Sequence, residues 1–202
     1  MNPNKEIEIK VRLNDKKAVQ KKLLSLGWTI ESLNFQREHR ITDKNNTLGE
    51  KGIFPRTRKE GTVSTFTIKV NPEGKFKSSD LNKKYFKRLE YDVGVEDADK
   101  MAEVLYILGL TEQRVLEKYR QTWTKTDKDY GLKIVIDFLS FGNYIELEGK
   151  EEEIEKMINA LELSGEERIP LAYWRVYKIY CEKNGLKEEK DLLFKKDEKS
   201  VF

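Results

Sequence analysis

Apolar and polar residues alternate along residues 6–13, so four aliphatic side chains face one side of an extended chain and the charged side chains face the other. The spacing then becomes helical, and Val19, Leu23 and Leu26 form one narrow apolar stripe. Gly27 follows the stripe, where a residue suited to a left-handed backbone commonly ends a helix. This stretch predicts a strand, a short turn and a helix that covers the apolar face of the strand.

The same pattern occurs a second time in the chain. Residues 6–28 align with residues 88–110 without a gap, at an offset of 82 (88 minus 6), and Gly109 takes the place of Gly27. A looser third copy combines the alternation of residues 144–149 with a helical stripe over 151–161. Each copy predicts a strand followed by a helix.

Further strands are predicted between the copies from alternation and from β-branched residues. They cover residues 35–42, 54–59, 63–70, 118–124 and 133–139. The order is therefore β-α-βββ, repeated once, and then helices, of which the last covers residues 171–184. This order indicates an α+β fold. We expect one domain over residues 1–185 and a charged tail over residues 186–202, where periodicity is lost.

Composition limits the chemistry that this chain can carry. Its 202 residues include 39 Lys and Arg, 36 Asp and Glu, one Cys and one His. A single Cys and a single His exclude an internal disulfide and a zinc site built from these residues, so any metal would be held by carboxylates, the ligands of Mg²⁺ or Mn²⁺. The small net charge does not favour nucleic-acid binding. No stretch resembles a signal peptide or a membrane span, so we expect a cytoplasmic protein, monomeric or homodimeric.

Charged and hydroxyl side chains occupy the strand positions opposite the apolar ones. A solvated sheet face would account for any single strand. If the strands form one sheet that curls on itself, however, these side chains share one interior. They are Glu6, Glu8, Lys10, Arg56, Arg58, Thr65, Thr67, Lys69, Arg88, Glu90, Asp92, Lys118, Arg120, Asp137, Glu146 and Glu148.

Charges in an interior are costly unless they are paired or bind ions. Clustered carboxylates suit divalent cations, and a wall of Arg and Lys suits a polyanion such as a phosphate chain. The chain lacks the glycine-rich GxxxxGK[ST] loop, so side chains would have to bind the phosphates.

At this point the ordered motifs resemble those of the CYTH superfamily, the triphosphate tunnel metalloenzymes. The resemblance covers about residues 5–180. It rests on the series E-x-E-x-K (residues 6–10), R-x-R (56–58), T-x-K (67–69), R-x-E-x-D (88–92), K-x-R (118–120), Asp137 and G-x-x-x-E-x-E (142–148).

The resemblance implies an antiparallel eight-stranded β-barrel that forms a tunnel, with the helices packed outside. It implies a small-molecule triphosphate substrate and Mg²⁺ or Mn²⁺ in a two-metal site. The residues that correspond to metal ligands are Glu6, Glu8, Asp137, Glu146 and Glu148. Those that correspond to phosphate-binding residues are Lys10, Arg56, Arg58, Lys69, Arg88, Lys118 and Arg120. We expect catalysis to depend on Glu6, Glu8, Lys10, Arg56, Arg58, Lys69 and Arg120. The helix near Tyr173 would pack at one tunnel mouth.

The leading interpretation is a metal-dependent hydrolase of the terminal phosphoanhydride of tripolyphosphate, thiamine triphosphate or a nucleotide. The alternative is a class IV adenylyl cyclase, in which the ATP 3′-hydroxyl attacks the α-phosphorus. Two departures favour hydrolysis: Arg40 stands where the family has an aromatic residue, and a His-Phe pair that some of these cyclases carry before residue 6 is absent. A third hypothesis is a non-catalytic binder of phosphorylated ligands or RNA 5′ ends, which should avoid carboxylates in its cavity.

Overall fold

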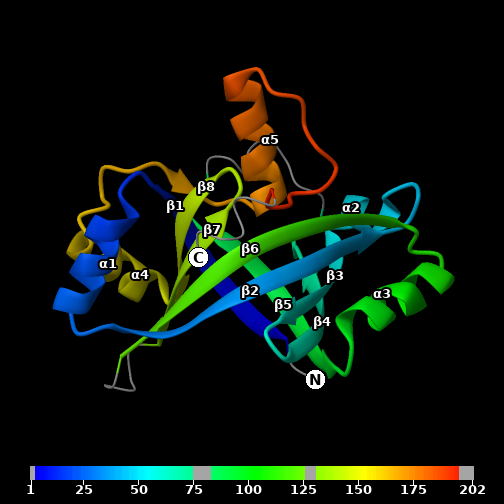
Figure 1. The fold of residues 1–202 in the computed structure, drawn as a ribbon, viewed down its shortest axis with the longest axis horizontal. Helices are drawn as coiled ribbons and strands as arrows, with labels where there is room; N and C mark the ends of the chain where they lie inside the picture. The colour runs from blue at the N-terminus through cyan, green and yellow to red at the C-terminus, as the bar shows by residue number, and fades with distance from the viewer. Residues whose placement is uncertain (1–2, 75–82, 126–130, 196–202) are drawn as a thin grey trace.

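The computed structural model describes residues 3–74, 83–125 and 131–195, and every structural statement concerns those ranges. Eight antiparallel strands form a barrel with the helices outside it (Figure 1). The strands are β1 (Asn4–Leu13), β2 (Thr29–Thr42), β3 (Ile53–Glu60), β4 (Val63–Val70), β5 (Phe86–Val95), β6 (Glu112–Thr124), β7 (Leu132–Leu139) and β8 (Gly142–Gly149). The helices are α1 (Lys16–Ser25), α2 (Thr47–Glu50), α3 (Ala98–Ile107), α4 (Glu151–Ala160) and α5 (Tyr173–Asn184).

The barrel closes through its first strand. The strand order is β5-β4-β3-β2-β6-β7-β8-β1, and β1 also pairs with β5. Within β1, residues 4–8 pair with β5 and residues 8–13 pair with β8. A short strand, β9 (Arg168–Ile169), adds to β1 beside Lys10 and Val11. The closed barrel confirms the predicted fold class.

The internal repeat is also confirmed, as β1-α1-β2-β3-β4 and β5-α3-β6-β7-β8, with α2 inserted in the first copy. The helix starts are equivalent, because Asp15 accepts a hydrogen bond from the Ala18 amide at 3.0 Å and Asp97 accepts one from the Lys100 amide at 3.0 Å. The helix of each copy is followed by a glycine with positive φ, at 80° for Gly27 and 94° for Gly109.

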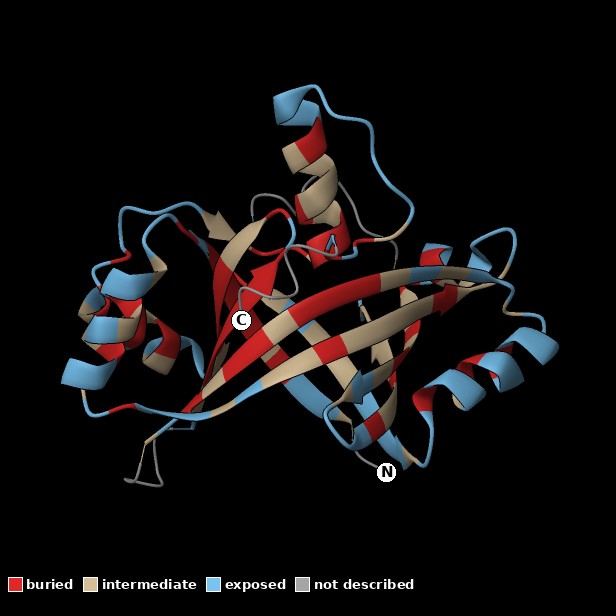
Figure 2. Cartoon of the chain, viewed as in Figure 1, coloured by how far each residue is buried: buried red, intermediate tan, exposed pale blue. Residues whose placement is uncertain are grey.

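The apolar core lies outside the barrel rather than inside it. Val19 and Leu23 of α1 and Ile154 and Ile158 of α4 pack on the outer faces of β1, β7 and β8. At the other end, α3 covers Ile41 and its neighbours. Figure 1 shows α1 and α4 together at one end, α3 at the other, and α5 beside the barrel. Figure 2 shows that the inward sides of these helices are buried and their outward sides exposed. The inner face of the barrel is thus left for polar side chains.

The C-terminal region contacts the barrel more closely than its composition suggests. Helix α5 begins at Tyr173, two residues later than predicted, because Ala172 has an extended backbone. Further on, Leu192 donates to the Val115 carbonyl and accepts from the Glu117 amide, both at 2.8 Å. This bridge continues the sheet along β6, where pairing with β7 covers only residues 119–123. Leu192 and Phe194 are buried.

The stretch at residues 191–194 is therefore a docked part of the expected tail. The domain boundary at residue 185 stays a prediction, and residues 196–202 of the tail lie outside the described ranges. Within those ranges, no helix is long and apolar enough to cross a membrane.

Candidate functional site

The inward side chains of the strands surround a cavity of about 200 Å³ in the barrel. Eleven of the twelve predicted site residues line it: Glu6, Glu8, Lys10, Arg56, Arg58, Lys69, Arg88, Lys118, Arg120, Glu146 and Glu148. The twelfth, Asp137, is fully buried behind the lining. The structure thus brings together the residues selected from the sequence, and the role of each remains a prediction.

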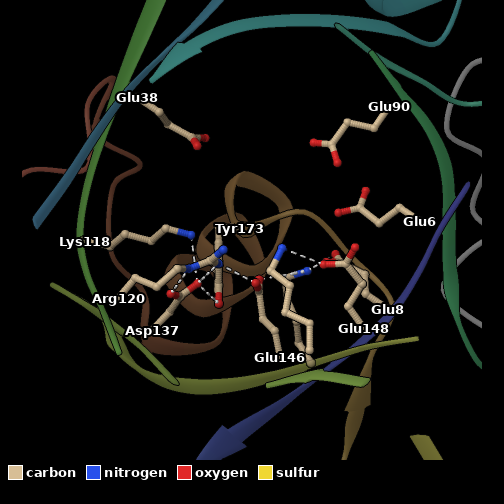
Figure 3. A network of polar contacts seen from close by, with 12 residues as sticks. Glu6, Glu8, Glu38, Glu90, Lys118, Arg120, Asp137, Glu146, Glu148 and Tyr173 are labelled. Carbon is tan, nitrogen blue, oxygen red and sulfur yellow. Dashed lines mark hydrogen bonds and ion pairs between the residues drawn. The ribbon is translucent and has the colours of Figure 1, made fainter. Parts of the chain in front are cut away.

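One side of the cavity is a dense network around Asp137 (Figure 3). Arg120 donates from Nε and Nη2 to the two Asp137 oxygens at 2.6 and 2.5 Å, and Lys118 donates at 2.8 Å. The Tyr173 hydroxyl, which comes from α5, donates to the same carboxylate at 2.9 Å. Burial works to raise the pKa of Asp137, but Arg120 and Lys118 outweigh it and lower that pKa below its ordinary value. Asp137 is therefore ionised and engaged by four hydrogen bonds.

The adjoining carboxylates on β1 and β8 are less evenly paired. Lys10 donates to Glu8 and lies 3.2 Å from Glu146, while Glu8 stands directly opposite Glu148 in the strand register. Burial raises the pKa of Glu8, and the charges of Glu6 and Glu146 raise it further against the opposing effect of Lys10. Carboxylates that repel in this way favour a cation between them.

These acids have the donor chemistry of a divalent-cation site, since every ligand atom would be a carboxylate oxygen, as Mg²⁺ and Mn²⁺ prefer. Among the described residues, no three Asp, Glu, His or Cys side chains converge as ligands of one ion in this arrangement. The amino group of Lys10 and the guanidinium of Arg120 occupy the space between the acids, because each pairs with Glu146. A metal ion between these acids would require the two cations to move away from Glu146.

The opposite wall, on β2 to β5, holds cations bridged by two further acids. Lys69 donates to Glu6 at 2.7 Å and lies 3.3 Å from Glu90. Arg56 donates to Glu38 at 3.2 Å and to Glu90 at 3.1 Å. Glu38 was not predicted as a cavity residue, because β2 is polar on both faces and its alternation gives little indication of which face turns inward.

Two arginines of this wall lack such partners. Arg58 and Arg88 form no ion pair within the described ranges, and the Nε of each is buried without a hydrogen-bond acceptor. Burial lowers the pKa of Arg58, with the charges of Arg56 and Arg120 adding to the effect, and burial lowers the pKa of Arg88 to about 10. A guanidinium that is desolvated without a carboxylate is destabilising, and it is well suited to bind an anion.

Aromatic side chains that the sequence analysis did not select hold one of these arginines. The Arg88 guanidinium lies 4.2 Å from the ring centre of Phe86 and 4.5 Å from that of Phe54. Phe86 precedes Arg88 by two residues, as Phe54 precedes Arg56, so ring and guanidinium share the inner face of each strand. This F-x-R spacing was a signal in the sequence that could have identified them. Trp174, which the sequence analysis also did not select, lines the cavity as well.

Comparisons with known proteins agree with this geometry. The CYTH domain model matches residues 4–172. Over 157 residues the chain is 27% identical to the protein named "Putative adenylate cyclase MJ0240" of Methanocaldococcus jannaschii. The aligned region covers 78% of this chain and 83% of that protein.

Two solved structures share the fold. A Vibrio parahaemolyticus protein with the same provisional name is 14% identical, with a TM-score of 0.65 over 87% of this chain and 99% of its own. HpAC1 from Hippeastrum, described as having a dominant triphosphatase activity, is 16% identical, with a TM-score of 0.57 over 93% of this chain and 100% of its own.

Proposed function

This chain belongs to the CYTH domain family, and on that premise we propose that it hydrolyses the terminal phosphoanhydride of a triphosphate inside its barrel. The observation that carries the proposal is the unequal pairing of charge in the cavity. Arg58 and Arg88 are desolvated without carboxylate partners in the described ranges, while Glu8 is crowded by other carboxylates. A substrate with several phosphates and its counter-cations would satisfy both groups at once.

The basic residues would bind the phosphate oxygens. Arg58 and Arg88 have unpaired donors, and a guanidinium can form two parallel hydrogen bonds with one phosphate. Arg56, Lys69 and Arg120 would exchange carboxylate partners for phosphate oxygens, with Lys10 and Lys118 beside them. This exchange would free the carboxylates of the cavity when the substrate enters.

The freed acids would hold Mg²⁺ or Mn²⁺, with Glu6, Glu8, Glu146 and Glu148 as ligands. When bound, such an ion offsets phosphate charge and makes a bound water more acidic. Asp137 could join them only if Arg120 or Lys118 released it, because its oxygens already accept four hydrogen bonds. Tyr173 would meanwhile keep Asp137 in place from α5.

A class IV adenylyl cyclase is the second candidate. It is favoured by the provisional name of the Methanocaldococcus relative, whereas the activity described for HpAC1 favours hydrolysis. Both reactions need the same hold on the triphosphate and differ in the phosphorus that is attacked. A non-catalytic binder is the third candidate, and the buried acids argue against it because they would repel an anionic ligand that arrives without cations.

The deciding experiment is product analysis. The protein is incubated with Mg²⁺ or Mn²⁺ and with tripolyphosphate, thiamine triphosphate or ATP, and the products are separated. Orthophosphate would support the hydrolase, and cyclic AMP with pyrophosphate would refute it in favour of the cyclase. Binding without turnover of any substrate would leave the binder. A Lys21→Gln variant, altered at an exposed position of α1, is the matched control.

A further inference from the structure

A C-terminal segment fills a gap in the barrel wall. Strand β2 pairs with β6 along residues 112–124, but β7 pairs with residues 119–123 only. Beside the rest of β6 lies residues 190–194, which we name the strap. The backbone of Leu192 bonds to β6 on both sides of Leu116, and the Asp191 carboxylate accepts from the Val115 amide at 2.7 Å. The strap thus makes the hydrogen bonds that a longer β7 would make here.

Side chains anchor the strap on two sides. The buried Glu117 carboxylate accepts from the Phe194 amide at 3.2 Å, and the Phe194 ring centre lies 5.5 Å from that of Tyr119. Leu192 is buried in one apolar cluster with Tyr173, the first residue of α5. The strap therefore joins the barrel wall to the start of that helix.

The first turn of α5 closes one side of the cavity. Tyr173 and Trp174 line the cavity and are buried, whereas Asp92 and Lys133 line it at exposed positions. The Tyr173 hydroxyl also reaches Asp137 behind the lining (Figure 3). A displacement of this turn would therefore open the cavity on a second side.

The connection between α5 and the strap is exposed. Residues 182–190 are all exposed, and Figure 1 shows the chain returning to the barrel beside α5. The Leu186 amide donates to the Cys181 carbonyl at 2.9 Å, and the Glu189 amide donates to the Tyr177 hydroxyl at 3.3 Å. Segments that bury little apolar surface open locally while the rest of a protein stays folded. The strap can therefore leave β6 without unfolding of the barrel.

We propose that the strap and the first turn of α5 form a latch, which opens and closes as one unit at the closed side of the cavity. When the strap is docked, the cluster around Leu192 holds Tyr173 in the cavity wall. Release of the strap removes this support, so the first turn of α5 leaves the wall and the cavity gains a second mouth. That a ligand in the cavity keeps the latch closed rests on the proposed function, whereas the coupling of strap and helix does not.

Hydrogen exchange tests the latch, because amides that exchange through one shared opening respond together when that opening changes. Two amides represent the two parts. Glu117 donates to the Leu192 carbonyl of the strap at 2.8 Å, and Val176 donates to the Ala172 carbonyl at the start of α5 at 3.2 Å. Amides of β8 report unfolding of the whole barrel.

Asp191→Ala removes the acceptor of the Val115 amide. It should speed the exchange of the Glu117 and Val176 amides by the same factor, about threefold to tenfold, the scale of one hydrogen bond. Exchange in β8 should not change. Asp191→Asn keeps a side-chain oxygen as acceptor and should restore slow exchange at both amides. Lys187→Gln, at an exposed position of the connection, is the matched control and should leave both amides as in the natural protein.

Faster exchange of Glu117 with no change at Val176 would overturn the proposal, because the strap would then open alone. Equal acceleration in β8 would overturn it as well, since the variant would have destabilised the whole barrel. An effect of Lys187→Gln as large as that of Asp191→Ala would exclude a specific role for the strap contact.

The exchange is then repeated with Mg²⁺ and the imido analogue of tripolyphosphate, which resists hydrolysis. A ligand that contacts the closed wall stabilises the closed state, so both amides should exchange about threefold or more slowly. Binding in calorimetry without slower exchange would overturn the role of the latch as a wall of the ligand site. If the analogue does not bind, the proposed function fails, and the Asp191→Ala comparison still decides whether strap and helix move together.

Discussion

Replacing Arg58 by Gln should stabilise the protein and impair its activity. Arg58 is a half-buried cation with a buried Nε and without an ion pair among the described residues, and the charges of Arg56 and Arg120 act against it. A side chain that exists to bind substrate is expected to destabilise the empty site. Gln keeps much of the volume and hydrogen-bonding capacity but removes the charge.

The expected gain in the free energy of unfolding of Arg58→Gln follows from the geometry of β3. Arg56 and Arg58 are two residues apart, which places their charges about 7 Å apart, where two unit charges repel by roughly 2 kcal/mol at an effective dielectric constant of about 20. Attraction to Glu38 and Glu60 offsets part of this repulsion. A net gain of about 1 kcal/mol should raise Tm by about 2–4 °C in a protein of this size.

The activity should move in the opposite direction. Loss of a charge-assisted hydrogen bond to phosphate costs about 1.5–3 kcal/mol, which lowers kcat/KM on the order of ten- to a hundredfold. Arg58→Lys should separate the two effects. It keeps the charge, so Tm should change little, but it loses the paired donors of the guanidinium, so kcat/KM should still fall.

Arg37→Gln is the matched control. Arg37 is also on a barrel strand, but it lies outside the cavity lining and pairs with the buried Glu117 at 2.6 Å. Its loss weakens the pairing of a buried carboxylate and should lower stability by about 1–2 kcal/mol without changing kcat/KM. Thermal melts and kinetics on tripolyphosphate measure both quantities. A lower Tm for Arg58→Gln would refute the reasoning about strain, and an unchanged kcat/KM would remove Arg58 from the site.

Three further changes test other parts of the structure. Glu148→Gln should abolish turnover and weaken Mn²⁺ binding in calorimetry. Its Tm should stay within about 2 °C of the natural protein's, because this partly exposed carboxylate adds little to stability. Normal turnover would exclude Glu148 as a metal ligand. Tyr173→Phe removes the hydrogen bond to Asp137 and should lower the free energy of unfolding by about 0.5–1.5 kcal/mol, as read from denaturant titrations; no change would mean that the bond contributes nothing. A side-chain hydrogen bond from Arg168 lowers the pKa of Glu155 to about 2 in the folded protein, below the ordinary 4.5, so its stabilisation is complete above about pH 4.5 and is lost as the pH falls toward 2. Unfolding is followed between pH 6 and pH 3. Over that range the free energy of unfolding of Glu155→Gln should fall by about 1–2 kcal/mol less than that of the natural protein. Parallel plots of the free energy of unfolding against pH would contradict the role given to Glu155.

The strands and the faces of their side chains could be predicted because that signal is local, whereas the closed barrel was expected from the resemblance to the CYTH superfamily. Alternation in β1, β3, β4 and β5 assigns each charged side chain to a face, and closure of the sheet then places all of those faces inside. The prediction was weakest for β2, for which only residues 35–42 were proposed of a strand that begins at Thr29. Its side chains are polar on both faces, so hydrophobic periodicity cannot assign them, and Glu38 and Arg40 were missed as cavity residues for that reason.

Features that depend on distant partners could not be predicted in the same way. The pairing of Leu192 with β6 joins segments that are far apart in the sequence, and the charged residues around Leu192 give it no periodic pattern. The lack of an ion-pair partner for Arg58 and Arg88 among the described residues is likewise a property of the assembled cavity. The sequence shows which charges face inward, but only the register and the side-chain directions show which of them are paired.

The position of β1 between β5 and β8 has a consequence for how the protein is made. Strand β1 leaves the ribosome before its partners, so it must wait for residues 86–90 before its first half is paired and for residues 143–148 before the barrel can close. The N-terminal repeat therefore cannot fold as an independent unit, and contacts of long sequence separation favour slow folding. Until the barrel closes and Leu192 pairs with β6, the chain exposes unpaired strand edges and a charged inner face. It therefore needs protection from aggregation for longer than a helical protein would.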